Sequence, residues 1–241
     1  MKNTHLQHPE DSILTGDLTA LDWFLADGDL SVKIDGAPAI VWGTNPATGN
    51  FFVGTKSVFN KVKIKINETH DDIDRNHSGN VADILHRCFD FLPSFDGIVQ
   101  GDFIGFGGDD TFCPNTITYI FDEIIEKDII IAPHTLYATD GEMKDAYVIN
   151  DMVDMEIFDD NDYVKFVQPK CWQVDEDFDE IVAFAKQMSC MCEFLTDKQS
   201  QQVQQQLTSV IRAGPATDYL TMDELAFANN IYSNFLRLWS L

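Results

Sequence analysis

Basic residues and long apolar runs are both scarce in this sequence. It holds 16 Lys and Arg residues against 40 Asp and Glu residues, a formal net charge of −24 at pH 7. Such a surface repels a phosphate backbone, so general nucleic-acid binding is disfavoured and a polynucleotide must meet a local positive patch. No apolar run approaches the roughly 20 residues that a membrane helix needs, so we expect no membrane partner.

Cysteine is also rare. The five cysteines are odd in number and scattered, which is typical of reduced thiols. The N-terminal MKNTHLQHPEDS has no apolar stretch of the kind found in signal peptides. We therefore expect a cytoplasmic protein. Cys190 and Cys192 form a CxC pair without a second pair nearby, so buried helix thiols are expected there rather than a zinc site.

Apolar residues are abundant enough for a sizeable core. They make up 44% of the 241 residues, and aromatics make up 12%, which excludes a mainly disordered chain. Periodicity predicts strands over 30–43 (with an internal turn), 51–55, 61–66, 97–106, 117–124, 128–137 and 146–150. It predicts helices over 17–27, 80–92, 176–213 and 221–239. The fold class is therefore α+β, with a core over 1–170 and a helical subdomain over 171–241.

The feature that carries chemistry is Lys33-Ile34-Asp35-Gly36, a KxDG motif at the end of a strand. Residues i and i+2 of a strand face the same way, so Lys33 and Asp35 would share one cavity. Gly36 permits a tight turn and a close approach of ligand. A lysine nucleophile must lose a proton held with a pKa of about 10.4, through burial or a nearby cation such as Mg²⁺. It could then attack the α-phosphate of a nucleotide; the alternative is a surface ion pair.

Several further blocks carry a family resemblance. KIDGAPAIVWG resembles the first motif of the covalent nucleotidyltransferases, which include DNA ligases, RNA ligases and mRNA capping enzymes. The blocks FFVGTKSVFNK, DDIDRNH, QGDFIGF, TFCPNTITY and IIIAPHTLY extend the resemblance to ligase-like proteins of tailed phages, over residues 8–137. It implies an adenylation domain of antiparallel sheets with flanking helices. It also implies the cofactors ATP and Mg²⁺, a nucleic acid with a 5′-phosphate end as partner, and the host cytoplasm as location.

The resemblance also implies roles for individual residues. Lys33 would be the adenylated lysine, and Asp35 and Gly36 complete its motif. Lys56 would hold phosphate, where ligases usually have arginine, and Asp102 would hold ribose or metal, where glutamate is commoner. The aromatic side chain that stacks on the purine has three candidates: Phe121, His134 and Tyr137. Glu10 lies where adenine-reading residues are expected.

The resemblance stops before the later motifs of the superfamily. No EGxV-like strand is evident, and only Lys165 and Lys170 stand where paired lysines should activate the α-phosphate. Without such lysines the developing phosphate charge loses stabilisation. The alternative is a ligase-derived protein without turnover. It would bind a nucleotide, or a protein partner through its acidic segment 140–180 or its helical C-terminal part.

Two other polar clusters are candidate binding sites. Lys56, Lys61, Lys63 and Lys65 place four of the 16 basic residues within ten positions. We predict a phosphate or nucleic-acid patch there; the alternative is an edge strand blunted by lysines. The run DDIDRN, between His70 and His77, resembles a cation-binding loop but lacks the glycine and closing glutamate of an EF-hand. A metal site is therefore not expected in it.

Overall fold

The chain divides into two compact units in the computed structural model, which describes residues 13, 15–22, 25, 29–31, 34–115, 118–149, 158–167, 171–173, 178–203, 205 and 220–221. The first unit comprises Met1–Leu6 and Lys33–Pro169, and the second comprises Gln7–Val32 and Lys170–Leu241. Gln7–Val32 belongs to the same unit as Lys170–Leu241. The reason is long-range pairing, because β1 (Asp29–Ser31) is antiparallel to β10 (Cys171–Gln173).

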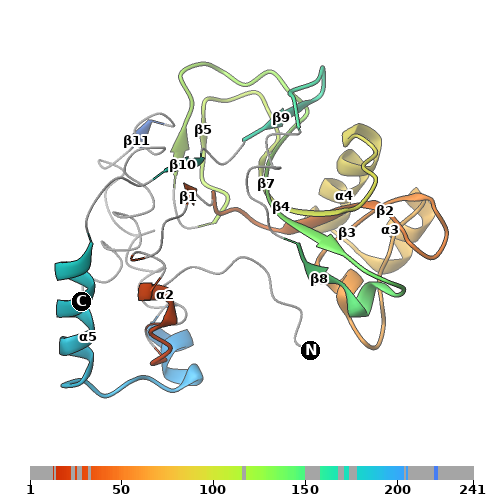
Figure 1. The fold of residues 1–241 in the computed structure, drawn as a ribbon. Coiled ribbons are helices and arrows are strands. Elements are labelled where there is room, and N and C mark those ends of the chain that lie inside the picture. Colours follow the sequence, from red (N-terminus) through yellow and green to blue (C-terminus); the bar gives the residue numbers. More distant parts are fainter. Residues whose placement is uncertain are drawn as a thin grey trace. The chain divides into compact units, whose positions relative to one another are not determined.

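A six-stranded sheet forms the centre of the first unit (Figure 1). Its strands are β2 (Ala39–Thr44), β3 (Phe51–Gly54), β4 (Ile98–Gly105), β7 (Ile129–Ala138), β8 (Tyr147–Val148) and β9 (Val164–Phe166). The order is β3-β2-β4-β7-β8, and all these pairs are antiparallel. β9 adds one parallel pair with the start of β7. The α+β class with antiparallel sheets is thus confirmed.

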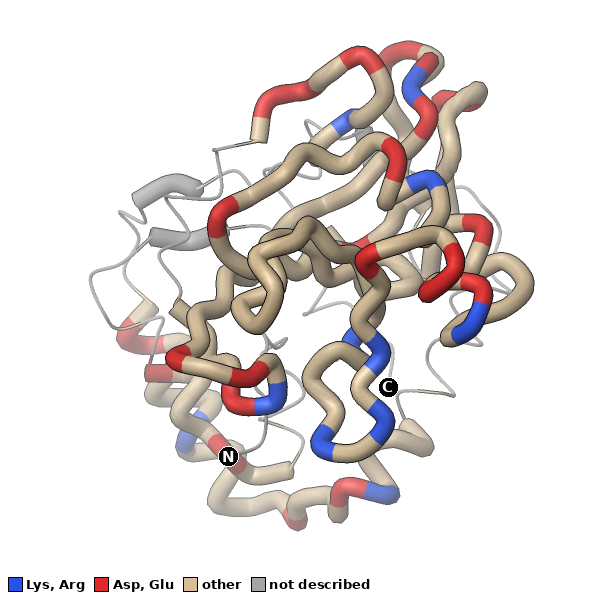
Figure 2. The backbone as a smooth tube through the Cα atoms, turned by 90° about the vertical axis from the view of Figure 1, so that its right-hand side faces the viewer, with Lys and Arg blue, Asp and Glu red and all other residues tan. Residues whose placement is uncertain are grey.

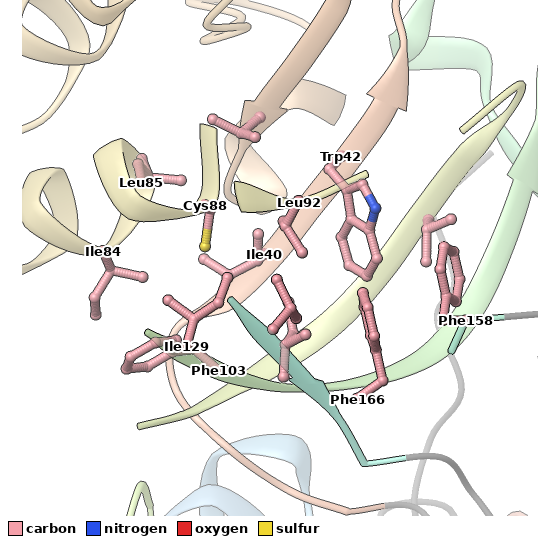
Figure 3. Packing of buried hydrophobic residues seen from close by; sticks show 14 of the residues in the cluster. Ile40, Trp42, Ile84, Leu85, Cys88, Leu92, Phe103, Ile129, Phe158 and Phe166 are labelled. Carbon is pink, nitrogen blue, oxygen red and sulfur yellow. The ribbon is translucent and has the colours of Figure 1, made fainter. Parts of the chain in front are cut away.

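One face of this sheet is covered by α4 (Asn80–Phe91), the helix expected over 80–92. Figure 3 shows its Leu85 and Cys88 side chains among those of Ile40 and Phe103 from the strands. The spacing of apolar residues in α4 places one stripe on the sheet, and burial of that stripe holds the helix in place. Burial also raises the pKa of the Cys88 thiol, so this cysteine is an inert part of the core.

A second helix, α3 (His70–Asn76), forms where the sequence analysis expects only a polar run. Thr69 is its N-cap and accepts a hydrogen bond from the backbone N–H of Asp72, while the Asp72 carboxylate accepts one from the Glu68 N–H. The pattern is similar to a capping box, but the Asp72 carboxylate accepts from the residue before the N-cap rather than from the N-cap itself. Only Ile73 of α3 is buried, so its apolar periodicity is too weak to indicate a helix.

The opposite face of the sheet carries the second apolar cluster of the first unit. Its members are Val41, Phe52, Val58, Phe59, Ile98, Tyr137, Met143 and Ala146. Two 3-10 helices contribute to it, η2 (Lys56–Phe59) and η3 (Met143–Asp145). A smaller antiparallel pair, β5 (Thr111–Phe112) with β6 (Tyr119–Ile120), also belongs to this unit. A strand is predicted over 117–124. Among the described residues of that range, only those of β6 form one.

The alternating segment 61–66 is not a strand, so that prediction is wrong. It is an exposed loop in which Lys63 has φ 58°. Val62 is 78% exposed and Ile64 is 41% exposed, so of the three apolar side chains only Ile66 packs against the sheet. The chain returns to the edge of the sheet only at Asn67, which bridges Val53. Period-two patterning is insufficient here because one left-handed residue ends the extended conformation.

The described part of the second unit is mainly helical. It includes α2 (Thr19–Asp22), α5 (Asp179–Ser189), a helical stretch over 197–203 and β11 (Leu220–Thr221). α5 ends at Ser189, before the predicted limit of 213, and the predicted helix 221–239 lies almost wholly outside the described residues. Cys190 and Cys192 are exposed free thiols rather than buried ones. Across the described helices, none has both the length and the apolar character that crossing a bilayer requires.

Candidate functional site

One end of the six-stranded sheet brings together four residues that the sequence analysis singles out: Asp35, Gly36, Asp102 and His134. Asp35 and Gly36 immediately precede β2, whose first residue Ala39 pairs with Asp102 of β4. Asp102 in turn pairs with Ala132 of β7, and His134 follows two residues later. Antiparallel register therefore brings the KxDG turn, the QGD strand and the APH segment together, although they are about 30 to 100 residues apart in sequence.

Gly36 lies directly against the backbone of β4. Its N–H donates to Asp102 Oδ2 at 3.4 Å, and the next N–H, of Ala37, donates to the Phe103 carbonyl at 3.0 Å. A Cβ at Gly36 would stand 2.4 Å from the Phe103 carbonyl oxygen. Glycine is thus needed for close contact between two strands, in addition to the turn that the sequence predicts.

Asp35 is hydrogen-bonded to two residues of the β5–β6 hairpin. The Tyr119 hydroxyl accepts from the Asp35 N–H and donates to the Asp35 carbonyl, both at 2.9 Å. The Asn115 amide donates to Asp35 Oδ2 at 2.6 Å. Asn115 and Tyr119 were not identified as site residues from the sequence. Their block, TFCPNTITY, was part of the resemblance, but no local pattern indicates that it reaches the KxDG turn.

Asp102 and His134 form a buried polar pair. They are 5% and 2% exposed, and His134 Nε2 lies 3.5 Å from Asp102 Oδ1. His134 Nδ1 and the Thr135 hydroxyl lie 2.6 Å apart. A buried carboxylate is costly unless it has partners, and the Gly36 N–H and the imidazole supply them. Asp102 therefore points inward; the sequence alone allowed an inward or an outward position.

The other two aromatic candidates lie in different surroundings. Tyr137 packs on Phe59 with ring centroids 4.7 Å apart, and its hydroxyl donates to Gln100 Oε1 at 3.0 Å. Burial raises the pKa of Tyr137, so the phenol remains a neutral donor. Phe121 contacts Phe112 of β5 edge to face, at 5.7 Å. His134 is the candidate that pairs with Asp102, at 3.5 Å.

Gln100 is a site residue that the sequence analysis missed. It is 1% exposed, and its Nε2 makes no hydrogen bond to the described part of the chain. It precedes Asp102 by two residues on β4, so both side chains lie on the same face of the sheet. A buried amide donor without a partner is uncommon in folded proteins. The apolar pattern of IVQGDFIG predicts one buried strand and does not indicate that Gln100 has a special role.

Two of the predicted residues, Lys33 and Glu10, lie outside the described residues. Lys56 is described, and its position differs from the prediction. β3 ends at Gly54, and Lys56 is the first residue of η2 rather than part of a strand. Because Gly54 pairs with Val41 near the start of β2, Lys56 still follows the strand end nearest Asp102. The Thr55 hydroxyl caps η2 and accepts from the Ser57 N–H, which explains why the strand stops there.

The lysine cluster is divided by the structure. Figure 2 shows basic residues following one another along one looped segment, while acidic residues are spread over the described chain. Lys61 and Lys63 are exposed on the loop. Lys65 instead donates from Nζ to the Asn76 carbonyl at 2.6 Å, at the end of α3. Burial, reinforced by the Lys65 ammonium, lowers the pKa of His77. Lys65 thus serves the fold of α3, which leaves Lys61 and Lys63 on the loop, and Lys56 on η2, as the candidates for phosphate.

Metal ligands are sparse near the sheet end. In the part of the chain that the structure describes, no three His, Cys, Asp or Glu side chains are arranged around a common metal position. Asp102 offers one carboxylate there. Mg²⁺ commonly uses only one or two protein carboxylates and takes its remaining ligands from water and substrate phosphates. The residues present therefore fit a metal that arrives with a nucleotide, but they do not form a closed metal site.

Comparison with known proteins identifies a family. Residues 3–233 match a family described as "Family of unknown function (DUF6267)". Because the match covers nearly the whole chain, the protein belongs to this family. No curated protein and no solved structure matches it.

Proposed function

We propose that this member of the DUF6267 family is a ligase-like nucleotidyltransferase. Lys33 attacks the α-phosphate of ATP, pyrophosphate leaves, and AMP is held on the lysine nitrogen. The AMP then passes to a 5′-phosphate end of a nucleic acid. The observation that carries the proposal is the 3.4 Å hydrogen bond from the Gly36 N–H to Asp102 Oδ2, which joins the KxDG turn to the QGD strand.

The neighbouring residues support this chemistry. Asp35 is fixed by Asn115 and Tyr119, so the residue two positions after Lys33 is held in one orientation. Asp102 is buried, accepts a hydrogen bond from the Gly36 N–H and lies 3.5 Å from the His134 imidazole. Preorganised groups of this kind stabilise developing charge without reorganising during the reaction. Mg²⁺, when bound with ATP, would neutralise phosphate charge, and Asp102 would hold it or the ribose.

An adenylylation assay tests the proposal. Full-length protein incubated with α-labelled ATP and Mg²⁺ should carry label after denaturation, and Lys33→Ala should carry none. Lys144→Ala is a matched control, because Lys144 is a surface lysine paired with Glu142, and it should label like the unaltered protein. Absence of label on the unaltered protein, with ATP and with GTP, would refute the enzyme.

One observation favours the alternative of a binding protein without turnover. Lys165, a candidate for the late phosphate-activating lysines, donates from Nζ to Asp160 Oδ2 at 2.7 Å on β9. It is thereby engaged in a local ion pair. Lys170 lies outside the described residues. If nucleotide binds with Lys33 unlabelled, the chain is a nucleotide-binding module instead, with protein contacts through its acidic or helical C-terminal part.

Salt dependence tests the nucleic-acid partner. If Lys61 and Lys63 contact a polynucleotide backbone, Lys61→Gln with Lys63→Gln should reduce the slope of log K against log salt by about 1.8 for duplex DNA. The slope falls because the two glutamines no longer neutralise two phosphates of the DNA backbone. The measurement is a fluorescence-anisotropy titration with 5′-phosphorylated DNA at several salt concentrations.

Lys65→Gln is the control for that titration. It should leave the slope unchanged and lower the free energy of unfolding by about 0.5–1.5 kcal/mol, because it removes one hydrogen bond at the end of α3. An identical slope in the double variant and the unaltered protein would exclude the loop as a nucleic-acid contact.

A further inference from the structure

Two histidines on neighbouring helices face each other across the surface of the first unit. His70 begins α3 and His86 lies within α4, and their Nδ1 atoms are 2.7 Å apart. The rings are nearly parallel, with centroids 5.0 Å apart. The side chain of His70 is 48% exposed and that of His86 is 28% exposed. The pair is therefore open to solvent ions.

The outer nitrogens of both rings are occupied by carboxylates. His70 Nε2 lies 3.0 Å from Asp90 Oδ1, and His86 Nε2 lies 3.0 Å from Asp74 Oδ1. An ionised carboxylate only accepts hydrogen bonds, so each Nε2 carries the proton. In a neutral imidazole the remaining nitrogen, Nδ1, then presents a lone pair. Both lone pairs point at the same place.

Two facing lone pairs repel each other unless a cation lies between them. A single shared proton would remove the repulsion and make one ring an imidazolium. A metal ion would satisfy both neutral rings. We propose that His70 and His86 bind a divalent transition-metal ion of the Zn²⁺, Ni²⁺ and Cu²⁺ class through their Nδ1 atoms, with Asp90 and Asp74 holding the rings from behind.

The arrangement has the second layer that metal-binding histidines usually show. Ligating imidazoles commonly donate their other N–H to a carboxylate, which fixes the tautomer and makes the ring a better ligand. Imidazole nitrogen suits Zn²⁺, Cu²⁺ and Ni²⁺, whereas Mg²⁺ and Ca²⁺ prefer oxygen. The site is thus distinct in chemistry from the carboxylate of Asp102.

The geometry needs an adjustment of both rings. A tetrahedral ion with bonds of about 2.0–2.1 Å would place its two nitrogens about 3.3 Å apart, so the nitrogens, now 2.7 Å apart, must separate by roughly 0.6 Å and both rings must turn until their lone pairs converge on the ion. Both side chains are partly exposed, and rotamer shifts can supply that movement. Water would complete the coordination. The bound ion would link α3 to α4 and stabilise their contact by mass action.

Calorimetric titration of the full chain with Zn²⁺ tests the site. One equivalent should bind, Cu²⁺ should bind more tightly than Ni²⁺, and Mg²⁺ should give no signal. His70→Ala and His86→Ala should each weaken Zn²⁺ binding at least about 100-fold, and Asp74→Asn about 10- to 100-fold. The double variant His5→Ala/His8→Ala removes the two N-terminal histidines and should leave the affinity unchanged.

Imidazole ¹⁵N spectra separate the metal from the shared proton. At saturating Zn²⁺ the Nδ1 resonances of His70 and His86 should both shift, while both Nε2 atoms keep their protons. The proposal is overturned if Zn²⁺ binds equally well to the His70→Ala and His86→Ala variants, or if an Nδ1 proton persists at saturation. Circular dichroism verifies that the variants are folded. Lys33→Ala should still bind Zn²⁺ at this site. Failure of the metal-site proposal can therefore be distinguished from failure of the proposed function.

Discussion

Replacing Asp102 with asparagine is expected to slow formation of the protein–AMP adduct about 100-fold, which corresponds to about 2.7 kcal/mol of lost transition-state stabilisation. Asparagine keeps an oxygen for the Gly36 N–H. It loses the charge that would hold Mg²⁺ or a polarised ribose hydroxyl, and it places a neutral amide beside His134. The measurement is the single-turnover rate of labelling at saturating ATP, compared with a thermal melt of the same preparation.

Asp122→Asn is the matched control, because Asp122 is an exposed carboxylate beyond β6. It should label at the unaltered rate. Asp102→Ala should be at least as slow as Asp102→Asn and should also destabilise the fold, since it leaves His134 buried without the carboxylate. Labelling by Asp102→Asn at the full rate would make Asp102 a structural residue and remove it from the proposed site.

Local patterns were sufficient for the elements with strong apolar periodicity. The central strands β4 and β7 and the helix α4 lie close to their predicted positions, because burial of a continuous face decides them. α3 was missed because Ile73 is its only buried residue, so its apolar periodicity is too weak to indicate a helix. The strand over 61–66 was wrong because Lys63 adopts a left-handed conformation that composition does not indicate.

The candidate site could be predicted only where its parts are contiguous. The turn at Asp35 and Gly36 was recognisable, and so was Asp102 within a conspicuously apolar strand. Asn115 and Tyr119 could not be found, since they contact Asp35 from 80 and 84 residues further along the chain. The His70–His86 contact depends in the same way on how α3 packs against α4. Periodicity indicates which residues are buried, but it does not indicate which polar residues meet.

Gly36→Ala is expected to lower the free energy of unfolding by about 1–3 kcal/mol, as other overpacking substitutions do, and to slow labelling about 100-fold. The added Cβ would meet the Phe103 carbonyl oxygen at 2.4 Å, so β2 and β4 must separate at this end of the sheet. A displacement of about 1 Å is enough to cost a factor of about 100 in rate. Denaturant unfolding and single-turnover labelling measure the two effects on the same protein.

Gly43→Ala separates the damage to the fold from the damage to the site. A Cβ at Gly43 would stand 2.0 Å from the Gly97 carbonyl oxygen, and its φ of +140° adds backbone strain. Its destabilisation should equal or exceed that of Gly36→Ala. Gly43 lies at the opposite end of β2, where it pairs with Ile98 rather than with the Asp102 region, so its folded fraction should label at the unaltered rate. Equal labelling rates in the two variants would mean that contact between the KxDG turn and β4 serves stability alone.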